Sequence, residues 1–402
     1  MTSLNFKPLG EVCDFYNGKA HEKAITEEGR YKVINSKFIS SEGKAYKLTD
    51  NLMFPLYKGD LCLVMSDVPN GKTLAKCFLV DADETYSLNQ RICTIRTDNF
   101  DLKFLYYQLN RHPFLLSFNN GENQTNLRKA DILSCPLWVP PIPEQKRIVA
   151  ILDQALAEIE QARAKTEQNL KNARELFESY LQQVFSQRGE GVIEVPLSEI
   201  TESISDGDHA APPKSEEGIP FITISNINKL TNEIDFTNTF KVPDSYYSAL
   251  KITRKPLQGD VLYTVTGSYG IPVIVKEEKE FCFQRHIGLV RPNNDTDSNW
   301  LYYLLMSPQV FKQADEGATG TAQKTVSLKL LRGLRVPKVP LKEQVNMVED
   351  LNLMYLKSKQ LTEIYTRKLE SLNELKNTIL QKAFSGELTK TLEGGTNKGA
   401  VA

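Results

Sequence analysis

The sequence predicts an α+β protein in which two globular domains of tandem-duplicated origin are joined by two long antiparallel coiled-coil helices, with a pseudo-two-fold relation between the repeats. Three observations lead to this prediction. Blocks of residues recur in the same order with a period near 200. Two segments of some 43 residues contain neither proline nor glycine. Each of these segments begins directly after a proline-containing stretch.

Length and composition are those of an ordinary water-soluble chain. It has 402 residues, of which 41% are hydrophobic and 25% charged. No apolar run approaches the roughly 18 residues that span a bilayer, and the first residues lack a secretory signal pattern. The six cysteines are scattered without a CxxC pair, which favours reduced thiols over a disulfide framework or a zinc site. We therefore expect a cytoplasmic protein with no membrane attachment.

The repeat is carried by matching blocks of similar residues at corresponding places in the two halves. These blocks are Pro8–Val12 and Pro196–Ile200, Lys58–Leu63 and Gln258–Tyr263, Asn89–Arg96 and Gln284–Arg291, and Leu105–Tyr107 and Leu301–Tyr303. From about Gln124 and Gln323 onward the offset is a constant 199 residues. The long period indicates duplication of a whole domain and not a short solenoid repeat.

Each repeat begins with about 140 residues that mix strand and helix signals. Short apolar runs predict strands at Tyr31–Ile34, Asp60–Met65, Ile92–Ile95, Ile219–Ile224, Asp260–Val265 and Ile287–Val290. Short helices are expected at Phe104–Asn110 and Trp300–Met306, each a few residues after a strand. A polar loop precedes each proline-free segment, at Asn119–Asn126 and Gly317–Lys324.

The prolines mark the starts of two long helices. Proline suits the first helical turn, where its missing N–H is not needed, and is excluded from the interior. Glu144 and Glu343 then lie in first turns, where the helix dipole favours an anion. Apolar residues at a spacing of three or four predict a coiled-coil seam, whose main positions are Ile148, Leu152, Ile159, Phe177, Met347, Leu351, Leu361, Leu372 and Ile379.

Pairing and direction of these helices follow from length and connectivity. Each would be roughly 60 Å long, and a lone helix of that length cannot bury its apolar stripe. The first helix delivers the chain to the second globular domain, so a pseudo-two-fold arrangement requires the second helix to run back antiparallel. The alternative is two independent domains, each with a helical tail.

These signals divide the chain into five segments. The first globular domain is expected at 1–141, the first helix at 142–188, the second globular domain at 189–339 and the second helix at 340–388. Residues 389–402 are expected to form a disordered tail.

No motif gives positive support for catalysis. The stretch from Asn70 to Thr73 resembles the end of a phosphate-binding loop, but Ser66 stands where that motif needs glycine. Asp244, Glu277 and Lys279 imitate a metal-dependent nuclease pattern that the first repeat lacks. The four histidines show no metal-ligand spacing.

Polar residues at matching places in both repeats are candidate DNA contacts. Glutamine and arginine directly precede a strand in both repeats, and both types form paired hydrogen bonds with base edges. With the residues after the Gly-Asp strands, Lys72 on its turn and the polar loops, the candidates are Ser66, Lys72, Gln90, Arg91, Asn123, Gln124, Thr266, Ser268, Tyr269, Gln284, Arg285, His286, Thr321, Gln323 and Lys324. A surface cluster without a ligand explains these residues equally well. The net charge of −1 also requires binding to depend on local patches, since nucleic-acid-binding domains are usually basic.

The duplicated arrangement resembles the specificity subunit of type I restriction-modification systems, across nearly the whole chain. The residues that carry the resemblance are the helix entries Ile142–Gln145 and Leu341–Gln344, the pairs Gly59-Asp60 and Gly259-Asp260, and the helix ends Leu181–Ser186 and Leu380–Leu388. The resemblance implies two target-recognition domains that each read half of a split site in double-stranded DNA. It also implies that the coiled coil fixes the unspecified spacer between the half-sites.

The partners are implied by the same resemblance. Two methylation subunits would dock on the coiled-coil helices and supply S-adenosylmethionine chemistry. Restriction subunits would add the ATP and Mg that translocation and cleavage require. This chain would then hold no cofactor or metal and would not be catalytic by itself. The alternatives are a scaffold that joins two protein-binding domains without DNA, and a nuclease that uses Asp244, Glu277 and Lys279.

Overall fold

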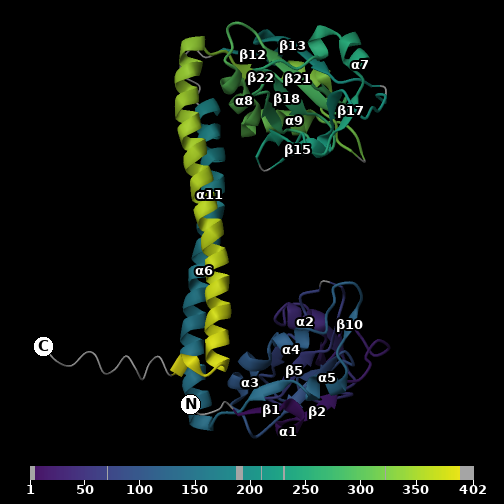
Figure 1. Cartoon of the computed structure of the whole chain (residues 1–402), viewed down its shortest axis with the longest axis vertical. Helices are drawn as coiled ribbons and strands as arrows, with labels where there is room; N and C mark the ends of the chain where they lie inside the picture. Colours follow the sequence, from purple (N-terminus) through teal and green to yellow (C-terminus); the bar gives the residue numbers. More distant parts are fainter. Residues whose placement is uncertain are drawn as a thin grey trace, which may run out of the picture. The chain divides into compact units, whose positions relative to one another are not determined.

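Figure 1 shows the computed structural model of the chain, which divides into two units. The structure describes residues 5–69, 71–186, 193–209, 211–229, 231–321 and 323–389. Unit 1 comprises Met1–Lys165 and Leu369–Ala402, and unit 2 comprises Thr166–Lys368. The globular part of unit 1 before residue 142 is called head 1, and the globular part of unit 2 between residues 193 and 340 is called head 2.

Head 1 is built on two small sheets. The antiparallel sheet has the order β2 (Asp14–Asn17), β9 (Ile92–Arg96), β5 (Leu61–Val64) and β7 (Cys77–Leu79), and the mixed sheet has the order β4 (Lys47–Thr49), β3 (Tyr31–Ile34) and β8 (Tyr86–Leu88). Two short antiparallel pairs complete the strands: β1 (Phe6–Pro8) with β11 (Pro136–Trp138), and β6 (Ser66–Asp67) with β10 (Thr125–Asn126). The helices are α1 (Leu9–Val12), α2 (Ser36–Ser40), α3 (Leu102–Leu109), α4 (Pro113–Leu116) and α5 (Lys129–Leu133).

Head 2 repeats this plan. Its antiparallel sheet has the order β13 (Thr201–Asp206), β21 (Ile287–Pro292), β18 (Val261–Thr264) and β19 (Pro272–Ile274), and its mixed sheet has the order β17 (Phe240–Val242), β14 (Ile219–Ile222) and β20 (Cys282–Phe283). Short pairs join β12 (Glu194–Pro196) to β22 (Arg335–Pro337) and β15 (Ile227–Asn228) to β16 (Glu233–Ile234). The helical segments are η1 (Leu197–Glu199), η2 (Ile224–Asn226), α7 (Asp244–Ala249), η3 (Ile252–Arg254), α8 (Ser298–Met306), α9 (Pro308–Gly317) and α10 (Leu328–Gly333). The matching strand orders confirm the predicted duplication.

The two short helices begin earlier than the sequence suggested. Helix α3 starts at Leu102 and α8 at Ser298, each two residues before the predicted start. The cause is the preceding aspartate, since Asp101 and Asp297 each accept hydrogen bonds from two N–H groups of the first turn. A side chain of this kind at the N-cap satisfies donors that the helix itself leaves free.

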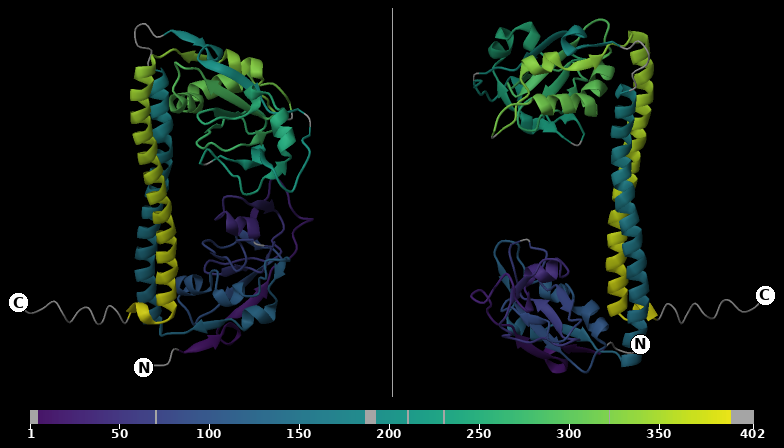
Figure 2. Two further views of the ribbon diagram at one scale, coloured as in Figure 1. Left: turned by 45° about the horizontal axis from the view of Figure 1, so that its top comes forward. Right: turned by 180° about the vertical axis from the view of Figure 1, so that it is seen from behind.

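Helices α6 (Ile142–Ser186) and α11 (Leu341–Phe384) pack side by side in each unit, as Figure 2 shows. In unit 1 the beginning of α6 and the end of α11 share one buried cluster, which includes Leu152 and Ala383. In unit 2 the end of α6 and the beginning of α11 share another, which includes Phe177 and Leu351. The start of one helix therefore packs on the end of the other, which confirms the antiparallel pairing.

At or next to the end of each long helix, an aromatic side chain packs into a head. Phe384 at the end of α11 meets Phe104 in the core of head 1, with 5.5 Å between ring centroids. Phe185 at the end of α6 meets Trp300 in the core of head 2, with 6.0 Å between centroids. Phe104 and Trp300 occupy corresponding positions of the two repeats, so the duplication extends to the way each head receives a helix end.

The predicted seam positions differ in burial. Ile148, Leu152, Ile159, Phe177 and Leu351 are buried, and the other four, Met347, Leu361, Leu372 and Ile379, are half-buried. The seam also contains a polar contact, in which the hydroxyl of Ser358 donates to the carbonyl oxygen of Ala173 at 2.6 Å. Several of these side chains share buried clusters with the other long helix, among them Leu152, Phe177 and Leu351. A role for them in docking other subunits stays a prediction.

No helix within the described ranges is long and apolar enough to cross a membrane. Of the predicted tail, 389–402, only Thr389 belongs to the described residues, and it is buried. The predicted boundaries between the five segments stay predictions.

Candidate nucleic-acid interface

In head 1 the structure brings two of the predicted polar segments together. Ser66 lies on β6, directly after the sheet strand β5, and β6 pairs with β10 of the polar loop. The side-chain amide of Gln124 donates to the Ser66 hydroxyl at 2.9 Å and, more weakly, to the side chain of Asn126 at 3.4 Å. Residues 58 positions apart thus form one exposed polar surface.

Head 2 makes the corresponding contact with different residues. Thr266 follows the sheet strand β18 and bridges to Thr325, the residue directly after the second polar loop. The N–H of Gly267 donates to the carbonyl oxygen of Lys324 in that loop at 3.2 Å. The two threonine hydroxyls lie 3.4 Å apart. In both heads the end of a central strand therefore meets the polar loop, which produces equivalent surfaces that carry different hydrogen-bonding groups.

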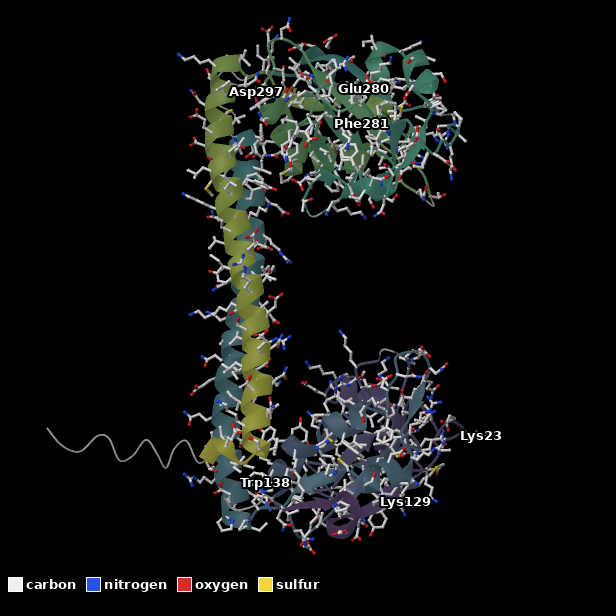
Figure 3. All side chains as sticks on the ribbon, in the orientation of Figure 1. Lys23, Lys129, Trp138, Glu280, Phe281 and Asp297 are labelled. Atoms are coloured by element: carbon white, nitrogen blue, oxygen red, sulfur yellow. The ribbon has the colours of Figure 1, made fainter. Side chains whose placement is uncertain are left out.

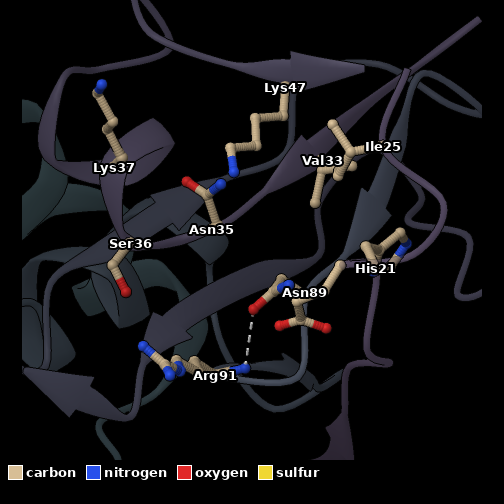
Figure 4. Close-up of a pocket in the computed structure, with 10 residues that line it drawn as sticks. His21, Ile25, Val33, Asn35, Ser36, Lys37, Lys47, Asn89 and Arg91 are labelled. Carbon is tan, nitrogen blue, oxygen red and sulfur yellow. Dashed lines mark hydrogen bonds between the residues drawn. The ribbon is translucent and has the colours of Figure 1, made fainter. Parts of the chain in front are cut away.

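The predicted pair Gln90 and Arg91 is exposed at the start of β9, and Figure 4 shows Arg91 beside a cavity. The Gln90 amide donates to the Glu22 carboxylate at 2.8 Å, and the Arg91 N–H donates to the Asn89 side chain at 3.2 Å. The cavity has a volume of about 340 Å³ and is also lined by Asn35, Ser36, Lys37 and Lys47. Its cationic groups outnumber its single carboxylate, so this part of head 1 suits an anionic ligand despite the near-neutral chain.

The matching place in head 2 also adjoins a cavity. Arg285 and His286, just before β21, line a space of about 410 Å³ together with Thr266 and Gln323. Gln284, the third predicted residue here, is half-buried, and its N–H donates to the carbonyl oxygen of Ile222 at 3.0 Å. Four predicted residues from three separate segments therefore meet at one cavity.

The carboxylates of the two cavities lie at different places: Glu22 of head 1 lies in the loop after β2, and Asp206 of head 2 lies on a sheet strand. Asp206 lies at the end of β13 and accepts a hydrogen bond from His209 at 2.9 Å. Arg254 lies 3.4 Å from the other carboxylate oxygen. A carboxylate accepts hydrogen bonds from the amino group of cytosine. Because the two cavities carry this group at different places, they present different arrangements of polar groups to a duplex.

Ser268, Tyr269 and Lys324 are engaged with neighbouring side chains of head 2. Ser268 accepts from Lys229 Nζ at 2.6 Å, while Tyr269 donates to Asp315. Lys324 Nζ donates to the same Asp315 carboxylate at 2.8 Å, and this contact, ahead of that of Tyr269, lowers the pKa of the Asp315 carboxyl. The charge of Lys324 is thus balanced within head 2, and a phosphate would compete with Asp315 for it.

Lys72, Asn123 and Thr321 are exposed and do not line either cavity. The turn that carries Lys72 closes on Asp67, whose carboxylate accepts from the N–H groups of Thr73 at 2.7 Å and Leu74 at 3.0 Å. Burial alone would raise the pKa of Asp67, but these hydrogen bonds lower it. The turn is held by a carboxylate where a phosphate-binding loop would present free N–H groups.

The three nuclease-like residues of head 2 do not share one site, because Glu277 and Lys279 line a cavity of about 210 Å³ that Asp244 does not line. Asp244 is the first residue of α7, and the Lys279 ammonium lies 3.9 Å from the ring centroid of Phe236. Within the described ranges, no group of three or more His, Cys, Asp or Glu side chains could hold a metal ion.

Sequence reasoning missed several residues at these sites. Glu22, Asn35, Lys37 and Lys47 line the cavity of head 1, and Asp206 and His209 line that of head 2. Lys229 and Asp315 bond to the predicted residues Ser268, Tyr269 and Lys324. Most lie in segments where the spacing between matching blocks differs between the repeats. The difference in loop length was the one feature of the sequence that marked these segments as variable. It could not identify single residues, because loops of unequal length cannot be aligned position by position between the repeats.

Comparison with known proteins assigns a family to this arrangement. The model of the family described as "Type I restriction modification DNA specificity domain" matches residues 2–170 and 191–374. The EcoBI type I restriction enzyme specificity subunit of Escherichia coli is 25% identical over 342 residues, which are 75% of this chain and 69% of that protein. The MjaVIII specificity subunit of Methanocaldococcus jannaschii is 22% identical over 405 residues, 94% of this chain and 92% of that protein.

Two solved structures share the fold. One, described as the structural basis of complex assembly and conformational transition of the type I R-M system, has a TM-score of 0.77 at 21% identity and covers 96% of this chain and 99% of its own. The HsdS subunit from Thermoanaerobacter tengcongensis has a TM-score of 0.60 at 21% identity and covers 96% of this chain and 98% of its own.

Proposed function

Because this chain belongs to the type I restriction modification DNA specificity family, we propose that its two heads read the two halves of a split DNA sequence. The chain recognises the DNA target of a type I restriction-modification complex and does not itself cut or methylate DNA. Head 1 reads one half-site and head 2 reads the other. Since the polar groups of the two heads differ, the two half-sites have different sequences.

The observation that carries this proposal is the repeated meeting of a strand end with a polar loop. Ser66 meets Gln124 in head 1, and Thr266 meets Thr325 in head 2. Arginine adjoins each surface, at Arg91 and Arg285. Exposed amide, hydroxyl and guanidinium groups on a rigid strand end are suited to hydrogen bonding with base edges in the major groove.

We further propose that the paired helices set the spacer between the half-sites and carry the partner subunits. Two methylation subunits would dock on α6 and α11 and bind S-adenosylmethionine. Restriction subunits would use ATP and Mg. With partners around the duplex, much of the phosphate neutralisation would come from them, which is compatible with the net charge of −1. A complex that acts on the cell's own DNA would work in the cytoplasm.

Sequencing of methylated adenines tests the proposal directly. Cells that carry this gene and its methylation subunits should contain methylated adenines in one split motif, with two defined halves and a fixed undefined spacer. Swapping head 2 for that of a relative should change one half of the motif and leave the other. Methylation that follows no sequence, or a single continuous motif, would contradict the proposal.

Insertion of helical turns tests the spacer role. Adding one matched turn to both α6 and α11, within the coiled coil, should lengthen the accepted spacer or abolish binding. An unchanged spacer would show that the helices do not set it.

A further inference from the structure

The glutamine after the proline-rich stretch of head 1 makes three hydrogen bonds to backbone groups. Gln145 Oε1 accepts the N–H of Asp101 at 2.7 Å. Its Nε2 donates to the carbonyl oxygen of Pro140 at 2.8 Å and to that of Asn99 at 3.2 Å. The side chain lies on the first turn of α6 and is completely buried. It therefore links the helix to the loop before it and to the loop that begins α3.

The corresponding glutamine of head 2 repeats the pattern atom for atom. Gln344 Oε1 accepts the N–H of Asp297 at 2.8 Å. Its Nε2 donates to the carbonyl oxygens of Val339 at 2.7 Å and Asp295 at 3.0 Å. Only 2% of Gln344 is exposed. Figure 3 shows Asp297 on the side of head 2 that meets α11.

Each carboxamide has a single bonded orientation. Its oxygen accepts from an N–H and its nitrogen donates to two carbonyl oxygens. If the amide were rotated by 180°, its oxygen would face the carbonyl oxygens and its NH₂ group would face the N–H. A buried polar group that loses its partner costs more than an ordinary hydrogen bond contributes. Starting the helix does not require this arrangement, because proline and glutamate suit a first turn without any contact to the head.

A second polar contact fixes each head further along its helix. The Tyr107 hydroxyl donates to Asp153 Oδ1 at 2.6 Å in unit 1. The Tyr303 hydroxyl donates to Asn352 Oδ1 at 2.6 Å in unit 2. Asp153 and Asn352 each follow the buried glutamine by eight residues, which is about 12 Å along a helix. Two directional contacts this far apart define the direction of the helix axis relative to the head.

We propose that Gln145 and Gln344 are positioning residues that restrict the assembled complex to one spacer length. This inference rests on the proposed function. Tyr107 and Tyr303 support the same role at the second contact of each head.

The physical reason lies in the geometry of DNA. One extra base pair moves a half-site by about 3.4 Å and turns it by roughly 35° around the duplex. Apolar packing is not directional, so a head that is held only by its apolar contacts could tilt to follow this change. A head that is also held by a buried, directional carboxamide must break hydrogen bonds to do so, and the wrong spacer is rejected.

The test uses the full chain in complex with its methylation subunits and DNAs that differ only in spacer length. Gln344→Met keeps the length of the side chain and removes all three hydrogen bonds. Gln344→Glu keeps an acceptor for Asp297 but places a second oxygen against two carbonyl oxygens. The control is Gln258→Ala in the same head, because Gln258 also donates to a backbone carbonyl, that of Lys276 at 2.9 Å, but is exposed and belongs to head 2 and not to α11.

We expect the native complex to methylate its site at the natural spacer far faster than at spacers one base pair longer or shorter. In Gln344→Met this preference should fall by at least about tenfold, because even one of the three lost hydrogen bonds corresponds to a factor of roughly that size. The sequences of the half-sites should stay the same. Gln344→Glu should behave likewise, and Gln258→Ala should keep the native preference.

An equal loss of rate at every spacer, with the preference unchanged, would overturn the inference and assign the glutamine to stability alone. A change in half-site sequence would also overturn it. A native complex that methylates no split site would refute the proposed function and the inference with it. If Gln344→Met does not fold, Tyr303→Phe removes one hydroxyl and should relax the spacer preference in the same direction, and no relaxation there would count against the inference.

Discussion

Head 1 and head 2 each contain an ion pair between an aspartate and an arginine at corresponding positions, Asp60 with Arg96 and Asp260 with Arg291. The surroundings of the arginine differ between the two heads. In head 2 the Arg291 side chain is 8% exposed and also donates to the carbonyl oxygen of Lys255 at 2.9 Å. In head 1 the Arg96 side chain is 32% exposed and lies 5.1 Å from the ring centroids of both Tyr16 and Tyr57. We call the sheets, the helices and the contacts between the matching blocks of each repeat the frame. Both repeats contain the hydrogen bonds of the frame, whereas the loops around it differ.

The difference teaches where each head can vary. Contacts that define the frame connect residues of matching blocks, so a change in one of them must be compensated at a fixed partner. The cavities also contain residues of loops that differ in length, such as Lys37, Lys47 and His209, and these residues can change without a compensating change in a matching block. Two domains that recognise different half-sites require this combination, a shared fold with different polar groups on the surface.

The largest expected effect comes from removing the carboxylate of the more buried pair. Asp260→Ala leaves Arg291 buried without its partner and should destabilise head 2 by about 3–5 kcal/mol. Asp60→Ala should cost head 1 less, about 1–3 kcal/mol, because Arg96 can turn to water. Hydrogen exchange of β18 and β5 measures the local free energy of opening in each head.

Asp244→Ala is the matched control, because Asp244 is exposed at the start of α7 and has no such partner. It should change the free energy of opening by less than about 1 kcal/mol. Equal losses for Asp60→Ala and Asp260→Ala would mean that the exposure of the arginine does not distinguish the heads.

The next effect concerns the aromatic ends of the long helices, where the two heads should respond alike. Phe384→Ala removes a ring from the core of head 1, and Phe185→Ala removes one from the core of head 2. Both side chains are half-buried, so each loss should be about 2–3 kcal/mol, below that of a fully buried phenylalanine. Hydrogen exchange should show that Phe384→Ala loosens α3 and that Phe185→Ala loosens α8.

Leu375→Ala on α11 serves as the control for this pair, since Leu375 is 46% exposed. It should leave both heads unchanged. Unaltered exchange in α3 of Phe384→Ala would show that the end of α11 does not stabilise head 1.

The frame was largely predictable from the sequence, for identifiable reasons. Proline followed by a long proline-free and glycine-free segment leaves little but a long helix, and the seam of Leu152, Phe177 and Leu351 required a partner. The duplication gave each element two independent signals. The starts of α3 and α8 were placed two residues too late because the capping roles of Asp101 and Asp297 were overlooked.

The interface was predictable only in part. Ser66, Gln124, Thr266 and Gln323 stood at repeated positions. The structure joins Ser66 and Gln124 on one surface at the end of a strand and places Thr266 and Gln323 at one cavity. Lys37, Lys47 and Asp206 could not be found, because which loop reaches a strand end depends on tertiary packing. The buried role of Gln145 was equally hidden, since an amide in a helix sequence normally indicates an exposed position.

A moderate effect, on recognition and not on stability, should distinguish the reading surfaces. Arg285→Ala should cost about 1–3 kcal/mol in binding of the assembled complex and relax specificity in one half-site. Arg91→Ala should do the same in the other half-site. Both side chains are exposed, so unfolding should be unchanged. Methylation rates on sites with single base substitutions measure these effects.

The opposite result has a clear signature. Uniform weakening over all sequences, with a smaller dependence on salt, would identify the arginine as a phosphate contact. That outcome would leave base reading to other residues of the cavities.

The smallest effect is a pH dependence that only head 1 should show, because the second contact of its helix uses Asp153 where head 2 uses Asn352. Burial alone would raise the pKa of Asp153, but hydrogen bonds from Lys103 and Tyr107 lower it below the unfolded value of about 3.9. A carboxyl group with a lowered pKa stabilises the folded state at pH values above the unfolded pKa, and this stabilisation is lost as the pH falls through the folded pKa.

Lys103 and Asp153 are both more than a third exposed, so the contribution of their ion pair is below about 1 kcal/mol. Asp153→Asn should therefore lower the thermal midpoint of head 1 slightly at pH 7, and the difference from the native chain should shrink as the pH falls below the unfolded carboxyl pKa of about 3.9. In head 2, Asn352→Asp should gain nothing at neutral pH, because Asn299 stands where head 1 has Lys103. A stabilising Asn352→Asp, or an Asp153→Asn difference that persists in acid, would show that the ion pair with Lys103 is not what separates the two joints.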